Sequence, residues 1–135
     1  PKPQNPKTPI QPLIMFIETS KGIIVMQDPE EWKSIKIIDG KKEHKFTPHD
    51  VDESWFISTH AKLKNCQELI ITAGGGDKVC KLWNLEGTLL HEFKNGKKIT
   101  SLCPLHTKIG GKDINGLIFA DKFGEVWFFN FDLIG

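Results

Sequence analysis

The chain has 135 residues, enough for one domain with a sizeable core, and its formal net charge of +1 implies no strongly acidic partner. All 18 basic residues are lysines, and the absence of arginine, which supplies the forked contact to phosphate and guanine, argues against direct reading of base sequence. The three cysteines lack metal-binding spacing and favour a reducing compartment, and no apolar run approaches the length of a membrane span.

The first twelve residues form a proline-rich segment that holds five of the eight prolines. Because proline has no backbone N–H to donate, this stretch cannot join a sheet along its length. We therefore expect residues 1–12 to be extended or disordered, and the folded domain to span residues 13–135.

From residue 13 onward the sequence indicates short strands separated by turns, with no convincing helical period. The expected strands are 13–18, 23–27, 34–38, 55–59, 68–73, 79–84, 88–93, 99–105, 116–121 and 125–131. The polar stretches 40–50 and 107–115 are expected to be loops. Strand 68–73 should pair antiparallel with 79–84, and strand 116–121 with 125–131.

Two stretches of the chain, 69–85 and 117–133, align without a gap at an offset of 48 residues. Each begins with an apolar run, passes through a glycine turn, and ends in an aromatic residue followed by Asn or Asp, at Trp83 and Phe131. A repeat near this period, closed by such a pair, is typical of the four-stranded blades of WD-type propellers. Trp83 and Phe131 are therefore expected to hold equivalent, largely buried places.

The expected fold class is all-β, and residues 13–135 are expected to form about the first three blades of a longer WD-repeat β-propeller, taken to be seven-bladed. Three blades, of which the last lacks a fourth strand, cannot close a propeller of about 4–8 blades. The alternative is a complete small β-sandwich or barrel.

The other candidate sites are explained better by structure than by function. Residues 74–78 suggest a phosphate loop, but Val79 begins a strand where such a loop needs a helix. A metal set in the polar loop matches no known spacing, and a solvated loop explains it better: His44, His49, Asp50, Asp52 and Glu53. Three histidines have no nearby nucleophile: His60, His91 and His106. We therefore expect no catalytic, cofactor-binding or metal site.

Five lysines are expected to gather around one loop edge: Lys94, Lys97, Lys98, Lys108 and Lys112. They either contact phosphate without regard to sequence or keep the loop solvated.

The segment 120–126, Ala-Asp-Lys-Phe-Gly-Glu-Val, with Leu-Ile-Phe before it, resembles a stretch of one WD-repeat family. That family is the non-catalytic subunit of the eukaryotic tRNA (guanine-N7) methyltransferase. The strand pair at 69–85 is similar to the family's preceding blade, and the polar insertion at 40–50 also fits. A generic WD repeat often carries Gly-His before its inner strand, whereas this chain has no Gly-His, so its repeats are degenerate.

The resemblance implies a nuclear scaffold subunit that is not itself an enzyme and needs no cofactor, small-molecule ligand or membrane. Its partner would be the catalytic methyltransferase subunit, which binds S-adenosylmethionine and methylates tRNA, and this chain would touch tRNA weakly or indirectly. The family's partner-contacting segment would lie beyond Gly135, so the contact residues stay unknown. Asp121 and Lys122 match the family motif, and Asp121 is expected to bond the backbone of its own turn.

Two other functions remain open. A WD-repeat adaptor in an unrelated complex would use the same fold. An enzyme with a site inside a propeller channel would need converging acid, base or metal groups, which the sequence does not offer.

Overall fold

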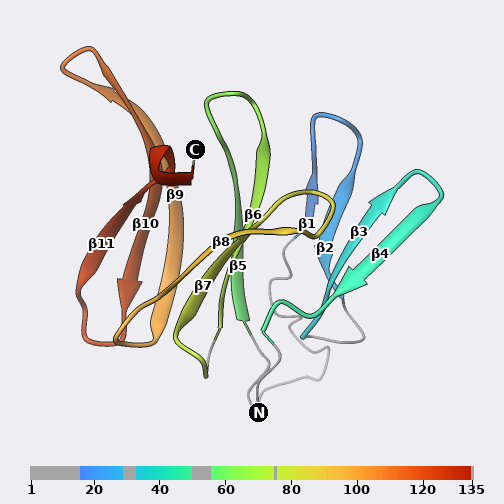
Figure 1. Ribbon diagram of the computed structural model, residues 1–135, viewed down its shortest axis with the longest axis horizontal. Helices are drawn as coiled ribbons and strands as arrows, with labels where there is room; N and C mark the ends of the chain where they lie inside the picture. Colours follow the sequence, from blue (N-terminus) through green and yellow to red (C-terminus); the bar gives the residue numbers. More distant parts are fainter. Residues whose placement is uncertain (1–15, 29–32, 50–55, 75, 135) are drawn as a thin grey trace, which may run out of the picture.

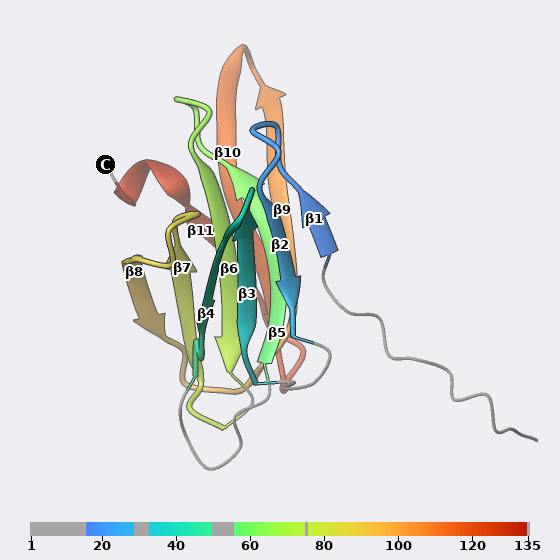
Figure 2. The same cartoon turned by 90° about the vertical axis from the view of Figure 1, so that its right-hand side faces the viewer.

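The computed structural model describes residues 16–28, 33–49, 56–74 and 76–134. Within these ranges the chain is all-β, with eleven strands in three antiparallel sheets and one short 3-10 helix. Figure 1 shows the three sheets standing beside one another, and Figure 2, turned by 90°, shows them one behind another. The predicted proline-rich segment 1–12, and residues 13–15 of the first predicted strand, lie outside the described residues.

The first sheet is a meander of four strands: β1 (Phe16–Glu18), β2 (Ile24–Gln27), β3 (Ile35–Asp39) and β4 (Lys42–Phe46). The prediction of a loop over 40–50 is wrong in its first half, since β4 pairs with β3 from Asp39↔Lys42 to Ile35↔Phe46. Gly40, at φ 62°, opens the tight turn between them. β4 is an exposed edge strand, so its polar side chains face water and give no apolar signal.

The second sheet is also a four-stranded meander, and its second strand lies at the centre of the molecule. Its strands are β5 (Phe56–Lys62), β6 (Glu68–Gly74), β7 (Val79–Trp83) and β8 (Leu89–Lys94). Every residue of β6 is buried, which explains why residues 69–71 form an apolar run without alternation.

The third sheet has the order β11-β10-β9, with β9 (Ile99–Ile109), β10 (Lys112–Asp121) and β11 (Val126–Asn130). The predicted loop 107–115 is wrong, because β9 and β10 pair as far as Ile109↔Lys112. Gly110 and Gly111, both at positive φ, close this hairpin in two residues. The 3-10 helix η1 (Phe131–Ile134) follows β11. The sequence predicts that Phe131 ends the strand 125–131, but Phe131 begins this helix instead.

Two apolar clusters join the sheets face to face. The cluster between the first and second sheets contains Val25, Ile35, Ile70 and Trp83. The larger cluster, between the second and third sheets, draws buried side chains from both: Leu69, Ile71, Leu82, Leu117, Phe119 and Phe131. Trp83 and Phe131 are 9% and 3% exposed, which confirms the prediction that both are buried. The predicted pairing of both hairpins is also confirmed.

The equivalence of Trp83 and Phe131 is wrong, however. Trp83 pairs with Ile70, and the matching pair in the third sheet is Phe129 with Leu117. The true offset is therefore 47 residues on the first strand of the hairpin and 46 on the second, in place of 48. The slip is one residue on the first strand, which moves a side chain to the opposite face of the sheet, and two residues on the second, which keeps the face. Strands that are apolar on both faces do not reveal either slip.

Candidate functional site

A buried chain of hydrogen bonds joins four side chains at one end of the second sheet. Thr72 comes from β6, Trp83 from β7, Asp77 from the turn between these strands, and His49 from the segment that follows β4. His49 Nδ1 lies 2.7 Å from Asp77 Oδ2, and His49 Nε2 lies 2.8 Å from Thr72 Oγ1. The Trp83 indole N–H donates to the same Thr72 oxygen at 3.0 Å. We call these residues the His49 network.

The partners fix where the protons of the His49 network lie. An ionised Asp77 can only accept, so His49 Nδ1 carries a hydrogen and donates to it. His49 Nε2 is then an acceptor, and the Thr72 hydroxyl donates to it while accepting from Trp83. When His49 is neutral, these hydrogen bonds satisfy every donor and acceptor that joins the four side chains of the network.

Burial and hydrogen bonding shift the pKa values of the network in one consistent sense. Burial lowers the pKa of His49 from 6.5, against the opposing effect of Asp77. Burial raises the pKa of Asp77, but the hydrogen bonds from His49 and the Val79 N–H outweigh it, so that pKa is lowered from 3.8. A neutral His49 that is 0% exposed has no access to a substrate. The network therefore acts as a structural tie between the segment after β4 and the second sheet.

A second contact strengthens that tie. Lys81 Nζ, on β7, donates to the Pro48 carbonyl at 2.8 Å, immediately before His49. Phe46 also packs on Trp83, with ring centroids 4.7 Å apart. The end of β4 and the residues that follow it are thus held against the face of the second sheet.

Asp121 has the turn role expected of it. Its Oδ1 accepts from the backbone N–H groups of Phe123 and Glu125 at 3.0 and 3.1 Å, and its Oδ2 accepts from the Trp127 indole at 3.0 Å. The Trp127 hydrogen bond is the main cause that lowers the pKa of Asp121 from 3.8. Lys122 is exposed, and its backbone N–H donates to the Lys98 carbonyl at 2.8 Å.

The predicted cluster of five lysines is wrong, because β9 separates its members. Lys94, Lys97 and Lys98 precede β9, whereas Lys108 and Lys112 flank the turn at its far end. At about 3.3 Å per residue, these two groups lie on the order of 30 Å apart. Lys78 and Lys122 join the first group instead. The Asn95 N–H donates to the Lys78 carbonyl at 2.9 Å, and the bond from Lys122 to Lys98 brings in the turn after β10.

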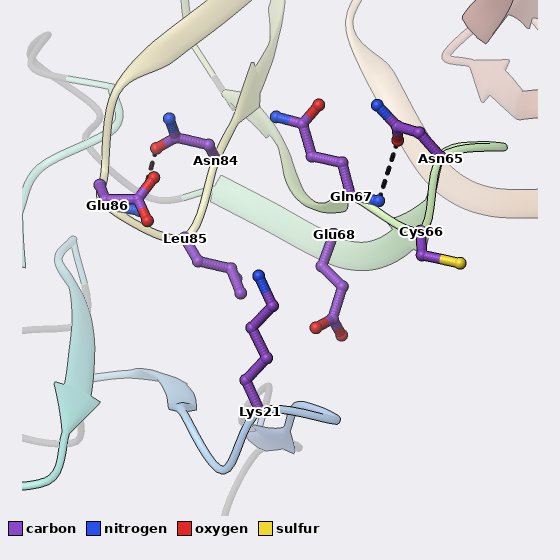
Figure 3. Close-up of a pocket in the computed structure, with 8 residues that line it drawn as sticks. All are labelled: Lys21, Asn65, Cys66, Gln67, Glu68, Asn84, Leu85 and Glu86. Carbon is purple, nitrogen blue, oxygen red and sulfur yellow. Dashed lines mark hydrogen bonds between the residues drawn. The ribbon is translucent and has the colours of Figure 1, made fainter.

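Figure 3 shows a polar pocket of about 470 Å³ between the first and second sheets, at the end opposite to the His49 network. The Lys21 side chain points into it beside the Glu68 carboxylate. Both Glu68 oxygens are engaged, one by Ser20 Oγ at 3.2 Å and one by His60 Nε2 at 3.0 Å. The rest of the lining is mostly amide and acidic: Asn65, Cys66, Gln67, Asn84, Leu85 and Glu86. The pocket offers hydrogen-bond donors and acceptors, and its Glu68 carboxylate is already occupied by Ser20 and His60.

The other sequence candidates are dispersed. Val79 begins β7 directly after the glycine-rich turn, so no helix stands behind a phosphate there. His44 stacks on Phe46 from β4, His49 is buried in its network, and Asp50, Asp52 and Glu53 lie outside the described residues. No group of three metal-ligating side chains occurs in the described part of the chain. His91 packs on Phe129 with centroids 5.2 Å apart, and His106 is exposed on β9.

The cysteines behave differently from one another. Cys80 is buried on β7, and burial raises the pKa of its thiol to about 12, so it acts as a small apolar side chain. Cys66 and Cys103 are exposed and free.

No protein-family model matches this chain, and no curated protein sequence matches it either. Within the described ranges, no helix is long and apolar enough to cross a membrane.

Sequence reasoning missed the role of His49, which it placed in a solvated loop. The residue before it is Pro48, so a search for the Gly-His pair of a generic WD repeat does not point to this histidine. A search for any His before the first strand of a repeat, with Trp near the end of the third, would have found it.

Proposed function

We propose that this chain forms consecutive blades of a WD-type β-propeller and works in the nucleus as the non-catalytic subunit of a tRNA (guanine-N7) methyltransferase. The observation that carries the propeller part is the His49 network. His49 precedes the first strand of a four-stranded antiparallel sheet, and Trp83 ends the third strand and is followed by Asn84. These are the places at which a WD repeat carries its His and its Trp.

The way the sheets stack also supports the propeller. Blades pack face to face, as the three sheets do through their two apolar clusters. The outer face of the third sheet repeats the chemistry of the packed face of the second: Ile118↔Phe128 and Ala120↔Val126 correspond to Ile71↔Leu82 and Ala73↔Cys80. Val126 and Phe128 are 68% and 45% exposed, so this face suits packing by a further sheet of the same kind.

A supporting role fits the side chains of the described residues. His49 and Asp77 are committed to each other, Asp121 is committed to its turn, and the polar pocket holds no acid–base pair aimed at a common point. A rigid subunit can raise a partner's activity by favouring its active conformation, without contributing a chemical group.

The tRNA part of the proposal rests on segment 120–126 alone. The second candidate, an adaptor in an unrelated complex, is favoured by the observation that Asp121 bonds the backbone of its own turn and the Trp127 indole. A side chain that stabilises a turn can occur in the blades of proteins from many different complexes, so this match does not single out the methyltransferase.

Reconstitution tests the proposal. The protein is mixed with a cognate methyltransferase subunit, tRNA and labelled S-adenosylmethionine, and the methylation rate is compared with that of the catalytic subunit alone. We expect a complex on gel filtration, a higher rate with the protein present, and neither methyl transfer nor cofactor binding by the protein alone. Equal rates with no complex would overturn the methyltransferase assignment and favour the unrelated adaptor.

A further inference from the structure

Three turns at one end of the molecule bring together lysines that are distant in sequence. Lys78 lies in the β6–β7 turn, Lys94 ends β8, Lys97 lies in the β8–β9 connection, and Lys122 lies in the β10–β11 turn. The backbone hydrogen bonds from Asn95 to Lys78 and from Lys122 to Lys98 hold these turns side by side. The cationic surface therefore extends across the second and third sheets.

A shallow depression of about 610 Å³ lies between the first two of these turns. Lys78 from the β6–β7 turn and Lys94 from the end of β8 line it, together with Gly76, Asn95 and Gly96. A Cβ added at Gly96 would meet nothing within 4 Å, so one wall is open backbone. Asp77 also lines the depression, but its carboxylate is committed to His49 and to the Val79 N–H.

The neighbouring turn adds an aromatic side chain to the cations. Phe123 is 65% exposed, and Lys97 Nζ lies 4.5 Å from the centroid of its ring. Asp121, the buried carboxylate of this turn, is used by the turn backbone and Trp127. A nucleic acid can place its phosphates on lysine ammonium groups and also stack a base on an exposed aromatic ring, whereas an acidic protein segment would use only the ammonium groups.

We propose that Lys78, Lys94, Lys97 and Lys122 form a surface that binds the phosphodiester backbone of RNA without reading its sequence. Counterion release drives such binding, so its affinity falls steeply with salt. The proposal deepens the proposed function and rests on it for the choice of tRNA as the RNA. Lys108 and Lys112, at the opposite end of β9, lie outside this surface.

The test is tRNA binding by the protein, measured by fluorescence anisotropy over a range of salt concentrations. K78Q/K94Q removes two charges from the depression, and K108Q/K112Q removes two charges at the far end as a matched control. We expect K78Q/K94Q to weaken binding about tenfold or more at low salt and to reduce the salt slope by about 1.5. The control should bind like the unaltered protein, and melting curves should show that both variants are folded.

Two results would overturn the RNA surface. One is the same tRNA affinity for both variants: an equal loss in the two would reflect net charge alone, and no loss in either would show that these lysines do not bind RNA. The other is competition by polyglutamate as effective as that by tRNA, which would indicate a site for acidic protein segments. Stimulation of the methyltransferase partner is a separate readout. If K78Q/K94Q stimulates the partner and still binds tRNA normally, only the proposed RNA surface is overturned. If the unaltered protein does not stimulate the partner, the scaffold assignment is overturned.

Discussion

The junction between the first and second sheets contains the buried hydrogen bonds of the His49 network, whereas the junction between the second and third is aromatic. At the first junction Thr72 bonds His49 and Trp83. At the second, the places of Thr72 and Trp83 are taken by Phe119 and Phe129. One backbone arrangement thus supports two kinds of packing.

At the second junction packed rings take the place of the His49 network, and Asn115 Nδ2 also donates to the Lys62 carbonyl at 3.0 Å. Phe93 packs on Phe119 and Phe129 with centroids 5.4 and 5.0 Å apart, and Phe129 meets Phe131 edge-on at 6.3 Å. Dispersion between rings is not strongly directional, so such a cluster can adjust to small changes. A buried polar chain cannot adjust in this way, because removing one member leaves its neighbours unpaired. The polar junction should therefore be the more sensitive to single substitutions.

Removal of the Trp83 ring should give the largest effect. W83A empties a buried site and takes away the donor to Thr72, so it should lower the free energy of unfolding by about 3–5 kcal/mol. F129A, at the matching place in the aromatic junction, should cost less because Phe129 is only half-buried. Denaturant unfolding of both variants measures the difference. A near-neutral W83A would show that the polar junction does not hold the sheets together.

Removal of one hydroxyl at the centre of the His49 network should cost about 1–3 kcal/mol, because T72V leaves His49 Nε2 and the Trp83 N–H unpaired in the core. T100V, at an exposed position on β9, is the control and should be close to neutral. In a double-mutant cycle of T72V with W83F, the second change should cost little after the first. Strict additivity would mean that the two side chains do not act through a shared bond.

A single added methyl group should destabilise the protein at Gly74, which is tightly packed, and have little effect at Gly96, which is open to solvent. The Cβ of G74A would run into the Asp77 carboxylate and the His49 ring, so overpacking should cost about 1–3 kcal/mol. G96A adds the same group where nothing lies within 4 Å and should leave the melting temperature almost unchanged. Equal melting temperatures for the two variants would contradict the packing of His49 against β6.

Lowering the pH should reduce the free energy of unfolding less than any of the substitutions W83A, T72V and G74A. His49 has a lowered pKa in the folded protein, so the unfolded chain binds more protons as the pH falls below 6.5. Its contribution is therefore present above pH 6.5 and is lost as the pH falls toward the folded-state value. The free energy of unfolding, measured from pH 7.5 to 5.5, should decline more steeply in the unaltered protein than in H49Q. Parallel curves would show that His49 does not titrate differently on folding.

Much of the fold follows from local sequence, and the rest depends on contacts that no local pattern reveals. The apolar run of β6 and the turn chemistry of Asp121 predicted a hairpin and a turn correctly. β4 and the far ends of β9 and β10 were missed because they are exposed and polar, and only their pairing partners make them strands. The offset between the repeats was wrong because strands buried on both faces carry no alternation to fix the register.

The site was harder to predict than the fold. His49 reaches Asp77 across 28 positions and Thr72 across 23, so neither partner is visible from the polar sequence around it. The lysines were grouped by their closeness in sequence, whereas β9 carries Lys108 and Lys112 to the opposite end and the turns bring Lys78 and Lys122 in their place.

The protonation state of His49 tests most directly whether the polar junction is a structural tie. Two-bond proton–nitrogen NMR spectra of the histidine rings, recorded as the pH is lowered, report both the tautomer and the pKa. We predict a neutral ring protonated at Nδ1 at pH 7 that stays neutral to a pH below 6.5. A ring protonated at Nε2, or one that titrates at or above 6.5, would contradict the buried network and return His49 to the class of accessible, reactive histidines.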